Sequence, residues 1–139
     1  MEHDDALRQP RPTWVLVLLL SVLTIAAYVA WLAWDRTSQT DPVTGDVSGP
    51  YEAWQVVGCA LTLGVLALVA GLRRRPGVAL AVVPLVFTVA WSVDAATTDE
   101  SGLWLVGAVL VLAGSLAGVA AVAYPAAAWA RRRQRTSRT

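Results

Sequence analysis

The stretch Arg73-Arg74-Arg75-Pro76-Gly77 lies between two long apolar segments and decides how the chain folds. Three adjacent guanidinium groups cannot remain in hydrocarbon, and a Pro-Gly pair cannot continue a helix. The stretch therefore predicts a tight turn between two membrane-spanning helices. Short loops rich in arginine stay in the cytoplasm, so we expect this turn on the cytoplasmic side of the membrane.

The composition favours a membrane protein. Of the 139 residues, 56% are hydrophobic and 15% are charged, and the mean hydropathy is +0.54. A soluble domain carries roughly 25% charged residues. The net charge of only +1 gives no support to a nucleic-acid partner. The chain has no lysine and no asparagine but much alanine, valine and arginine, a skew that is typical of a GC-rich bacterial genome.

Four apolar segments predict four membrane-spanning helices in an all-α integral membrane protein. The predicted spans are residues 14–34, 50–72, 78–96 and 103–123. A helix of 20 residues is about 30 Å long and matches the hydrocarbon core. A cleaved signal peptide is the alternative for the first span. That span is longer than the core of about 7–15 residues in a signal peptide and it ends in tryptophans, so we favour a retained helix.

The arginines predict the orientation of the membrane domain, residues 14–130. The polar lead (1–13), the central turn and the basic tail (131–139) hold 2, 3 and 5 arginines, whereas the remaining segments hold only Arg36. This distribution predicts that both termini lie in the cytoplasm and that the protein resides in the cytoplasmic membrane. The expected topology determinants and lipid anchors are Arg73, Arg74, Arg75, Arg131, Arg132 and Arg133.

Prolines and small polar residues predict where the helices begin and bend. Pro50 is expected at the first position of the second helix, with Glu52 near the positive end of the helix dipole. Pro84 should kink the third span, and Pro125 should kink or end the fourth. Ser101 is the expected N-cap of the fourth helix.

Small residues recur four positions apart in the second and fourth spans. The two stripes are Ala60, Gly64, Ala67 and Gly71, and Ala113, Gly114, Ala117, Gly118 and Ala121. Helices in lipid associate where side chains lack bulk, so both stripes are predicted to be buried in helix contacts of a compact four-helix bundle. The alternative is that alanine and glycine are scattered by genome composition and face lipid as often as protein.

A weak internal repeat relates the two halves of the chain. The matched positions are Trp31 with Trp91, Asp35 with Asp94, Trp54 with Trp104, and Gly58 with Gly107. These matches could reflect two tandem helical hairpins related by an axis along the membrane normal. Apolar sequence of low complexity also produces such matches by chance.

Apart from Glu52 in the first turn of the second span, Asp94 is the only acidic residue inside a predicted span. It lies about 24 Å along its helix, near the outer boundary of the hydrocarbon. A carboxylate within the membrane is a functional candidate, although a residue so near a helix end can simply reach water. The functional alternative is an outward-facing patch that could hold a cation over aromatic faces. Its predicted members are Asp94, Glu52, Gln55, Ser92, Trp54 and Trp91.

No constellation for catalysis or metal binding is visible. The only histidine, His3, lies in the polar lead, and the only cysteine, Cys59, cannot form a C-x-x-C pair. The chain also lacks the first-span glutamate of small multidrug exporters, the cysteine pair of quinone-linked thiol oxidoreductases, and the asparagine and paired phenylalanines of dual-topology fluoride channels. We therefore expect no enzymatic activity, no metal and no cofactor.

The sequence predicts a small multi-pass membrane protein with a non-enzymatic role. Its partners are expected to be the lipid bilayer and either further copies of itself or a larger membrane complex, and not nucleic acid. The alternative is a small transporter or channel that uses the patch around Asp94.

Overall fold

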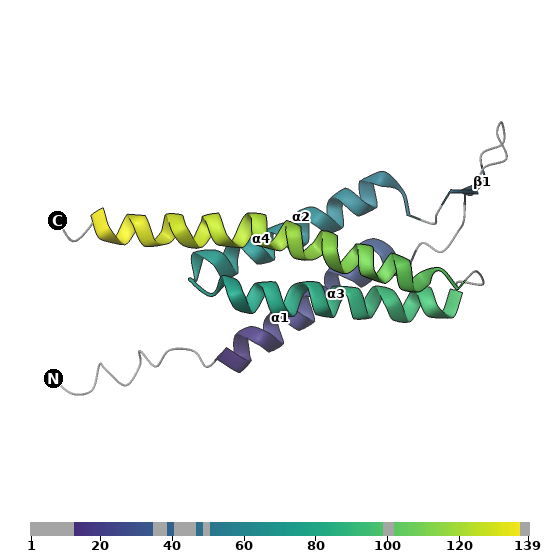
Figure 1. The fold of residues 1–139 in the computed structure, drawn as a ribbon, viewed down its shortest axis with the longest axis horizontal. Coiled ribbons are helices and arrows are strands. Elements are labelled where there is room, and N and C mark those ends of the chain that lie inside the picture. Colours follow the sequence, from purple (N-terminus) through teal and green to yellow (C-terminus); the bar gives the residue numbers. More distant parts are fainter. Residues whose placement is uncertain (1–12, 35–38, 41–46, 49–50, 99–101, 137–139) are drawn as a thin grey trace.

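The protein is all-helical apart from one short strand pair (Figure 1). The computed structural model describes residues 13–34, 39–40, 47–48, 51–98 and 102–136. Its elements are α1 (Thr13–Tyr28), the π-helical turn η2 (Val29–Ala33), β1 (Gln39–Thr40), β2 (Val47–Ser48), α2 (Ala53–Leu72), α3 (Pro76–Thr98) and α4 (Trp104–Thr136). The two strands pair antiparallel. Within the described residues, four helical segments are long and apolar enough to span a membrane, which confirms the prediction of four such helices.

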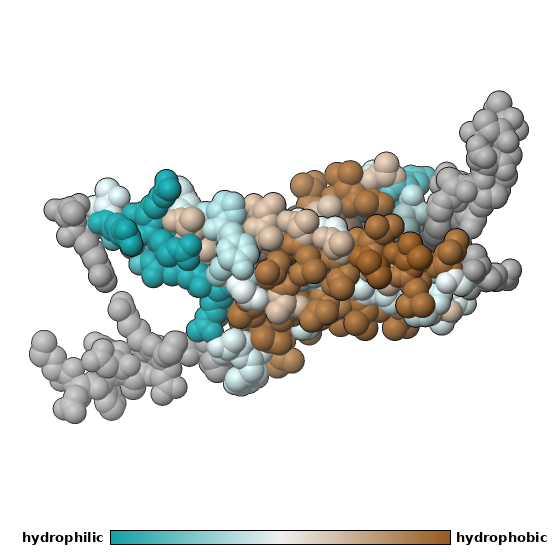
Figure 2. All heavy atoms as spheres, viewed as in Figure 1, coloured by the Kyte–Doolittle hydropathy of each residue, from teal (hydrophilic) through white to brown (hydrophobic). Residues whose placement is uncertain are grey.

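Successive helices run in opposite directions along the bundle. The start of α1, the α2–α3 turn and the end of α4 lie together at one end (Figure 1). We call this the arginine end, because Arg73–Arg75 and Arg131–Arg133 are there; the opposite end, which carries Glu52 and Asp94, is the acidic end. Figure 2 shows hydrophobic residues along the middle of the bundle and hydrophilic residues gathered at the arginine end.

The predicted arginine turn is present, but it is closed differently from the expectation. The amide of Arg75 donates to the carbonyl of Ala70 at 3.0 Å, and that of Arg74 donates to Gly71 at 2.8 Å. Arg74 has φ 61, so a residue with a side chain occupies the left-handed position that usually holds glycine. The Pro-Gly pair does not form the turn; Pro76 begins α3, where its missing N–H leaves no helical bond unmade.

Two helix boundaries differ from the prediction. α2 begins at Ala53, with Glu52 as its N-cap, instead of at Pro50. α4 passes through Pro125 and ends only at Thr136, so the first six residues of the predicted tail are helical. Alanine, arginine and glutamine are strong helix formers, and cations stabilise the negative end of a helix, so this segment continues the helix beyond the proline. Pro50 and the predicted N-cap at Ser101 lie outside the described residues.

The core consists largely of small side chains. Ala67, Ala70, Ala79 and Ala123 have no exposed surface. At the arginine end, α2 and α4 approach so closely that a Cβ atom on Gly71 would collide with the carbonyl oxygen of Ala123. The van der Waals contact that holds membrane helices together is therefore closest at this end of the bundle.

Two tryptophans pack directly on two glycines. A Cβ atom on Gly58 of α2 would lie 2.5 Å from Cζ3 of Trp31, and one on Gly107 of α4 would lie 2.5 Å from Cη2 of Trp91. Each contact joins two helices that follow each other in the chain. The same four residues are matched in the sequence repeat; a duplication of the hairpins themselves stays a prediction.

We predict that Gly58→Ala and Gly107→Ala destabilise the fold. The added methyl group must displace an indole ring, and overpacking of this kind costs on the order of 1–3 kcal/mol. The effect should be larger at Gly58, because the Trp31 Nε1 donates to Thr62 Oγ1 at 3.1 Å and holds the ring in place. Thermal unfolding in detergent measures both changes.

Gly64→Ala on α2 is the matched control. No atom lies within 4 Å of a Cβ built at Gly64, so this change gains only helix propensity, up to about 1 kcal/mol. If Gly58→Ala unfolds at as high a temperature as Gly64→Ala, the tryptophan–glycine contact does not contribute to stability.

Candidate functional site

The first group of candidate residues lies at the start of α2. Glu52 and Gln55 form a capping box, in which the backbone amide of Glu52 donates to Gln55 Oε1 at 2.6 Å. Gln55 has no exposed surface. The indole Nε1 of Trp54 donates to the Glu52 carboxylate. Two residues that were predicted as ligand donors therefore stabilise the beginning of a helix.

Three tryptophans stack beside this capping box. The Trp31 and Trp54 rings meet edge to face, with centroids 6.1 Å apart and planes at 72°. The ring centroid of Trp34 lies 6.4 Å from that of Trp54, and the Trp34 Nε1 donates to the carbonyl of Ala30 at 2.9 Å. The cluster joins η2 to α2 at the acidic end, where such rings suit the boundary between hydrocarbon and water.

Asp94 belongs to a second group, between α1 and α3. Tyr28 interacts electrostatically with Asp94 and with Tyr51. Its ring packs edge to face on Phe87 of α3, at a centroid distance of 6.0 Å. Asp94 follows Phe87 by seven residues, two helical turns, and so lies on the same face of α3.

The Tyr28 hydroxyl is buried beside a carboxylate. Tyr28 is 5% exposed, and its hydroxyl lies near the side chains of Tyr51 and Asp94. By contrast, the Ser21 hydroxyl donates to the carbonyl of Val17, one turn earlier in its own helix, at 2.9 Å. Polar side chains therefore gather between α1 and α3 at the acidic end, where a buried hydroxyl needs a polar neighbour.

The predicted patch is thus brought together in part. Glu52, Gln55 and Trp54 are neighbours at the start of α2, whereas Asp94 interacts with Tyr28, which also interacts with Tyr51. Trp91 packs on Gly107 of α4. Ser92 is half-buried on α3. Tyr28 and Tyr51 could have been recognised as site residues from the sequence, because each has a phenolic hydroxyl near the same end of the spans as the Asp94 carboxylate.

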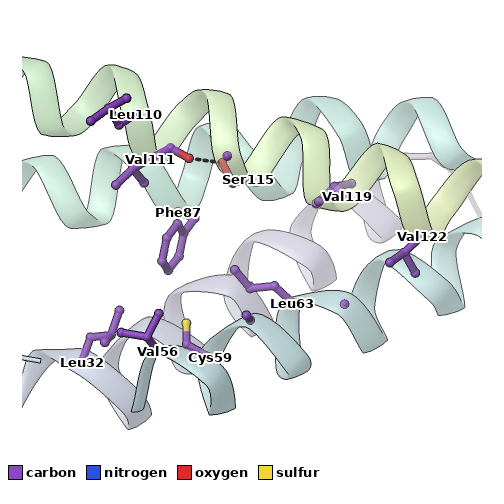
Figure 3. A pocket seen from close by; sticks show the side chains of 14 residues that line it. Leu32, Val56, Cys59, Leu63, Phe87, Leu110, Val111, Ser115, Val119 and Val122 are labelled. Atoms are coloured by element: carbon purple, nitrogen blue, oxygen red, sulfur yellow. Dashed lines mark hydrogen bonds between the residues drawn. The ribbon is translucent and has the colours of Figure 1, made fainter. Parts of the chain in front are cut away.

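An apolar groove separates α2 from α4 towards the acidic end (Figure 3). Its volume is about 360 Å³, and Phe87 of α3 enters it from one side. Its residues from the two small-residue stripes are Ala60, Gly64, Gly114 and Gly118. The Ser115 hydroxyl on the wall donates to the carbonyl of Val111 at 2.6 Å, so it is satisfied within α4. The described lining is otherwise apolar.

The prediction that the small-residue stripes are buried is correct only for the part of the α2 stripe near the arginine end, where Ala67 and Gly71 are buried. Ala60, at the other end of the same stripe, is exposed. The α4 stripe is exposed throughout, and no atom lies within 4 Å of a Cβ built at Gly114 or Gly118. α2 and α4 cross close to the arginine end and diverge towards the acidic end (Figure 1), so the α2 stripe meets a neighbour at one end only.

The predicted lipid anchors all lie at the arginine end. Arg131, Arg132 and Arg133 are exposed in the last turns of α4. The guanidinium carbon of Arg133 lies 3.8 Å from the ring centroid of Trp129, a cation–π contact that holds both side chains where the helix leaves the hydrocarbon.

Comparisons with protein-family models, with curated proteins and with solved structures gave no match to this chain. Within the described residues, no group of three or more His, Cys, Asp or Glu side chains could hold a metal ion. The candidate functional sites are the groove between α2 and α4 and the polar groups at the acidic end.

Proposed function

We propose that the protein is a small multi-pass membrane protein of non-enzymatic role, which associates with a second copy of itself through the groove between α2 and α4. The observation that carries this proposal is the open space at Gly114 and Gly118, where a partner backbone can approach without meeting a side chain. α4 packs against both α2 and α3, but residues of its small-residue stripe remain exposed and are open to contacts with a partner.

A symmetric contact between two α4 helices fits this surface. Lipid chains are as apolar as leucine, so membrane helices associate where glycine and alanine allow close van der Waals contact. The stripe formed by Ala113, Gly114, Ala117, Gly118 and Ala121 is exposed along its whole length. Residues of the same stripe face each other in a two-fold dimer, and the groove beside it receives the larger side chains of the partner.

We predict that Gly114→Leu and Gly118→Leu weaken the dimer and leave the fold of each copy unchanged. A Cβ atom at these positions has no atom of its own chain within 4 Å, and a leucine there blocks the approach of a partner helix. Overpacking on the order of 1–3 kcal/mol raises the dissociation constant about fivefold to a hundredfold. Energy transfer between labelled copies in liposomes measures association, and thermal unfolding in detergent measures the fold.

Ala81→Leu is the matched control, because Ala81 is an exposed small residue of α3 outside the groove. It should leave association unchanged. A parent protein that stays monomeric at every protein-to-lipid ratio would overturn self-association. The protein would then act as an accessory subunit of a larger membrane complex.

For the orientation, we propose that the arginine end faces the cytoplasm and that the protein resides in the cytoplasmic membrane, with both termini inside. The supporting observation is that the turn arginines and the α4 arginines lie at the same end of the bundle. In intact cells of a Cys59→Ala background, a cysteine at Thr98 should react with an impermeant thiol reagent. A cysteine at Gln134 should react only after permeabilisation, and the reverse pattern would contradict this orientation.

A second candidate function is the transport of small cations past Asp94. The observation that favours it is the buried Tyr28 hydroxyl beside this carboxylate. Sodium and rubidium flux into liposomes that contain the purified protein tests the idea. Flux should be lost in Asp94→Asn and retained in Ser92→Ala. Flux that is unchanged in Asp94→Asn removes the carboxylate from the mechanism.

A further inference from the structure

A second cavity lies at the arginine end, between the first turns of α1 and the α2–α3 turn. Its volume is about 390 Å³, and it is lined by Val15, Leu16 and Leu19 on one side and by Arg73 and Arg75 on the other. Val15 and Leu19 are one helical turn apart, so the apolar wall extends about 6 Å along α1 from the level of the arginines. The cavity therefore combines an apolar wall with two cations at its polar edge.

The backbone of these two arginines is held in place by the turn. The amide of Arg73 donates to the carbonyl of Val69 at 3.0 Å, and that of Arg75 donates to Ala70 at 3.0 Å. The side chain of Arg75 also donates to the Thr13 hydroxyl at the start of α1. Arg74 sits between them in the left-handed conformation and does not line the cavity. The turn thus directs its first and third arginines to the cavity and leaves the second outside.

No carboxylate of the described part of the chain is near enough to neutralise these arginines. The acidic residues there are Glu52 and Asp94, and both lie at the acidic end. Glu52 precedes α2 and Arg73 follows it, which separates them by about 30 Å, more than a Debye length at physiological ionic strength. No carboxylate among the described residues competes with an external anion for the positive charge at the cavity.

We propose that this cavity binds one anionic phospholipid, with its phosphodiester on Arg73 and Arg75 and an acyl chain along Val15, Leu16 and Leu19. Guanidinium groups bind phosphate oxygens through paired, charge-assisted hydrogen bonds. The apolar wall begins at the level of the headgroup and continues towards the hydrocarbon, as an acyl chain does. A basic pocket between membrane helices is a known type of anionic-lipid site. This site is separate from the groove between α2 and α4 and does not depend on self-association.

The test is lipid binding by the purified full-length protein in a neutral detergent. The probes are phosphatidylglycerol, phosphatidylcholine with the same acyl chains, and inorganic phosphate. Native mass spectrometry counts bound lipid, and thermal unfolding reports stabilisation. We expect one phosphatidylglycerol per chain and a raised unfolding temperature, little retention of phosphatidylcholine, and no comparable stabilisation by inorganic phosphate.

Variants separate a built site from general attraction to positive charge. Arg73→Gln and Arg75→Gln should each weaken phosphatidylglycerol binding on the order of tenfold, because a charge-assisted contact is lost. Arg74→Gln removes the same charge from the same turn and should change binding by less than about twofold, because it removes no such contact. Leu19→Trp keeps every arginine but fills the apolar wall, and it should also weaken binding.

Three outcomes would overturn the proposal. Equal retention of phosphatidylcholine would show that the headgroup charge is not recognised. Stabilisation by inorganic phosphate as strong as that by phosphatidylglycerol, together with an unchanged Leu19→Trp, would show an anion site without an acyl chain. A loss in Arg74→Gln as large as in Arg73→Gln would show delocalised attraction only. Thr13→Val breaks the contact with Arg75 but keeps its charge, and it shows whether a loss in Arg75→Gln reflects only a disturbed turn.

Discussion

Charge cannot enter hydrocarbon, and every backbone amide inside it must bond within the chain; the structure depends on these two constraints. They confine arginines to the ends of the helices and make each apolar segment helical. Where hydroxyl groups enter the spans, those of Ser21, Thr62 and Ser115 donate to the carbonyl one turn earlier in their own helix. The Tyr28 hydroxyl cannot reach its own backbone and instead lies beside Asp94 of another helix.

The features that the sequence predicts correctly are those that depend on position along the chain. Hydropathy locates four spans, and the arginines locate a turn, because each property follows from the local composition. The direction in which each helix face points cannot be predicted from the local composition. The small-residue stripe of α4 keeps the same spacing from Ala113 to Ala121. Whether its residues contact a neighbour depends on the angle at which α2 crosses α4. The close contact falls at Gly71, Ala123 and Ala126 instead.

In the candidate site, too, the sequence predicts the chemistry of single side chains but not which of them are neighbours. Glu52 and Gln55 have the chemistry of ligand donors, but a helix start three residues later than expected makes them a capping box. Asp94 was recognisable as a carboxylate within a span. Its neighbour Tyr28 is 66 positions away in the chain, and only the packing of α1 on α3 brings the two together.

Both tryptophan–glycine contacts join helices that are consecutive in the chain: Trp31 precedes Gly58, and Trp91 precedes Gly107. The contact of Trp31 with Gly58 can therefore form as soon as α2 has entered the bilayer, while α3 and α4 are still to be synthesised. The contact of Trp91 with Gly107 requires α4, as do the contacts of α2 with α4. The order of synthesis thus allows the first two helices to pack, with an indole ring on the backbone of a glycine, before the other two arrive.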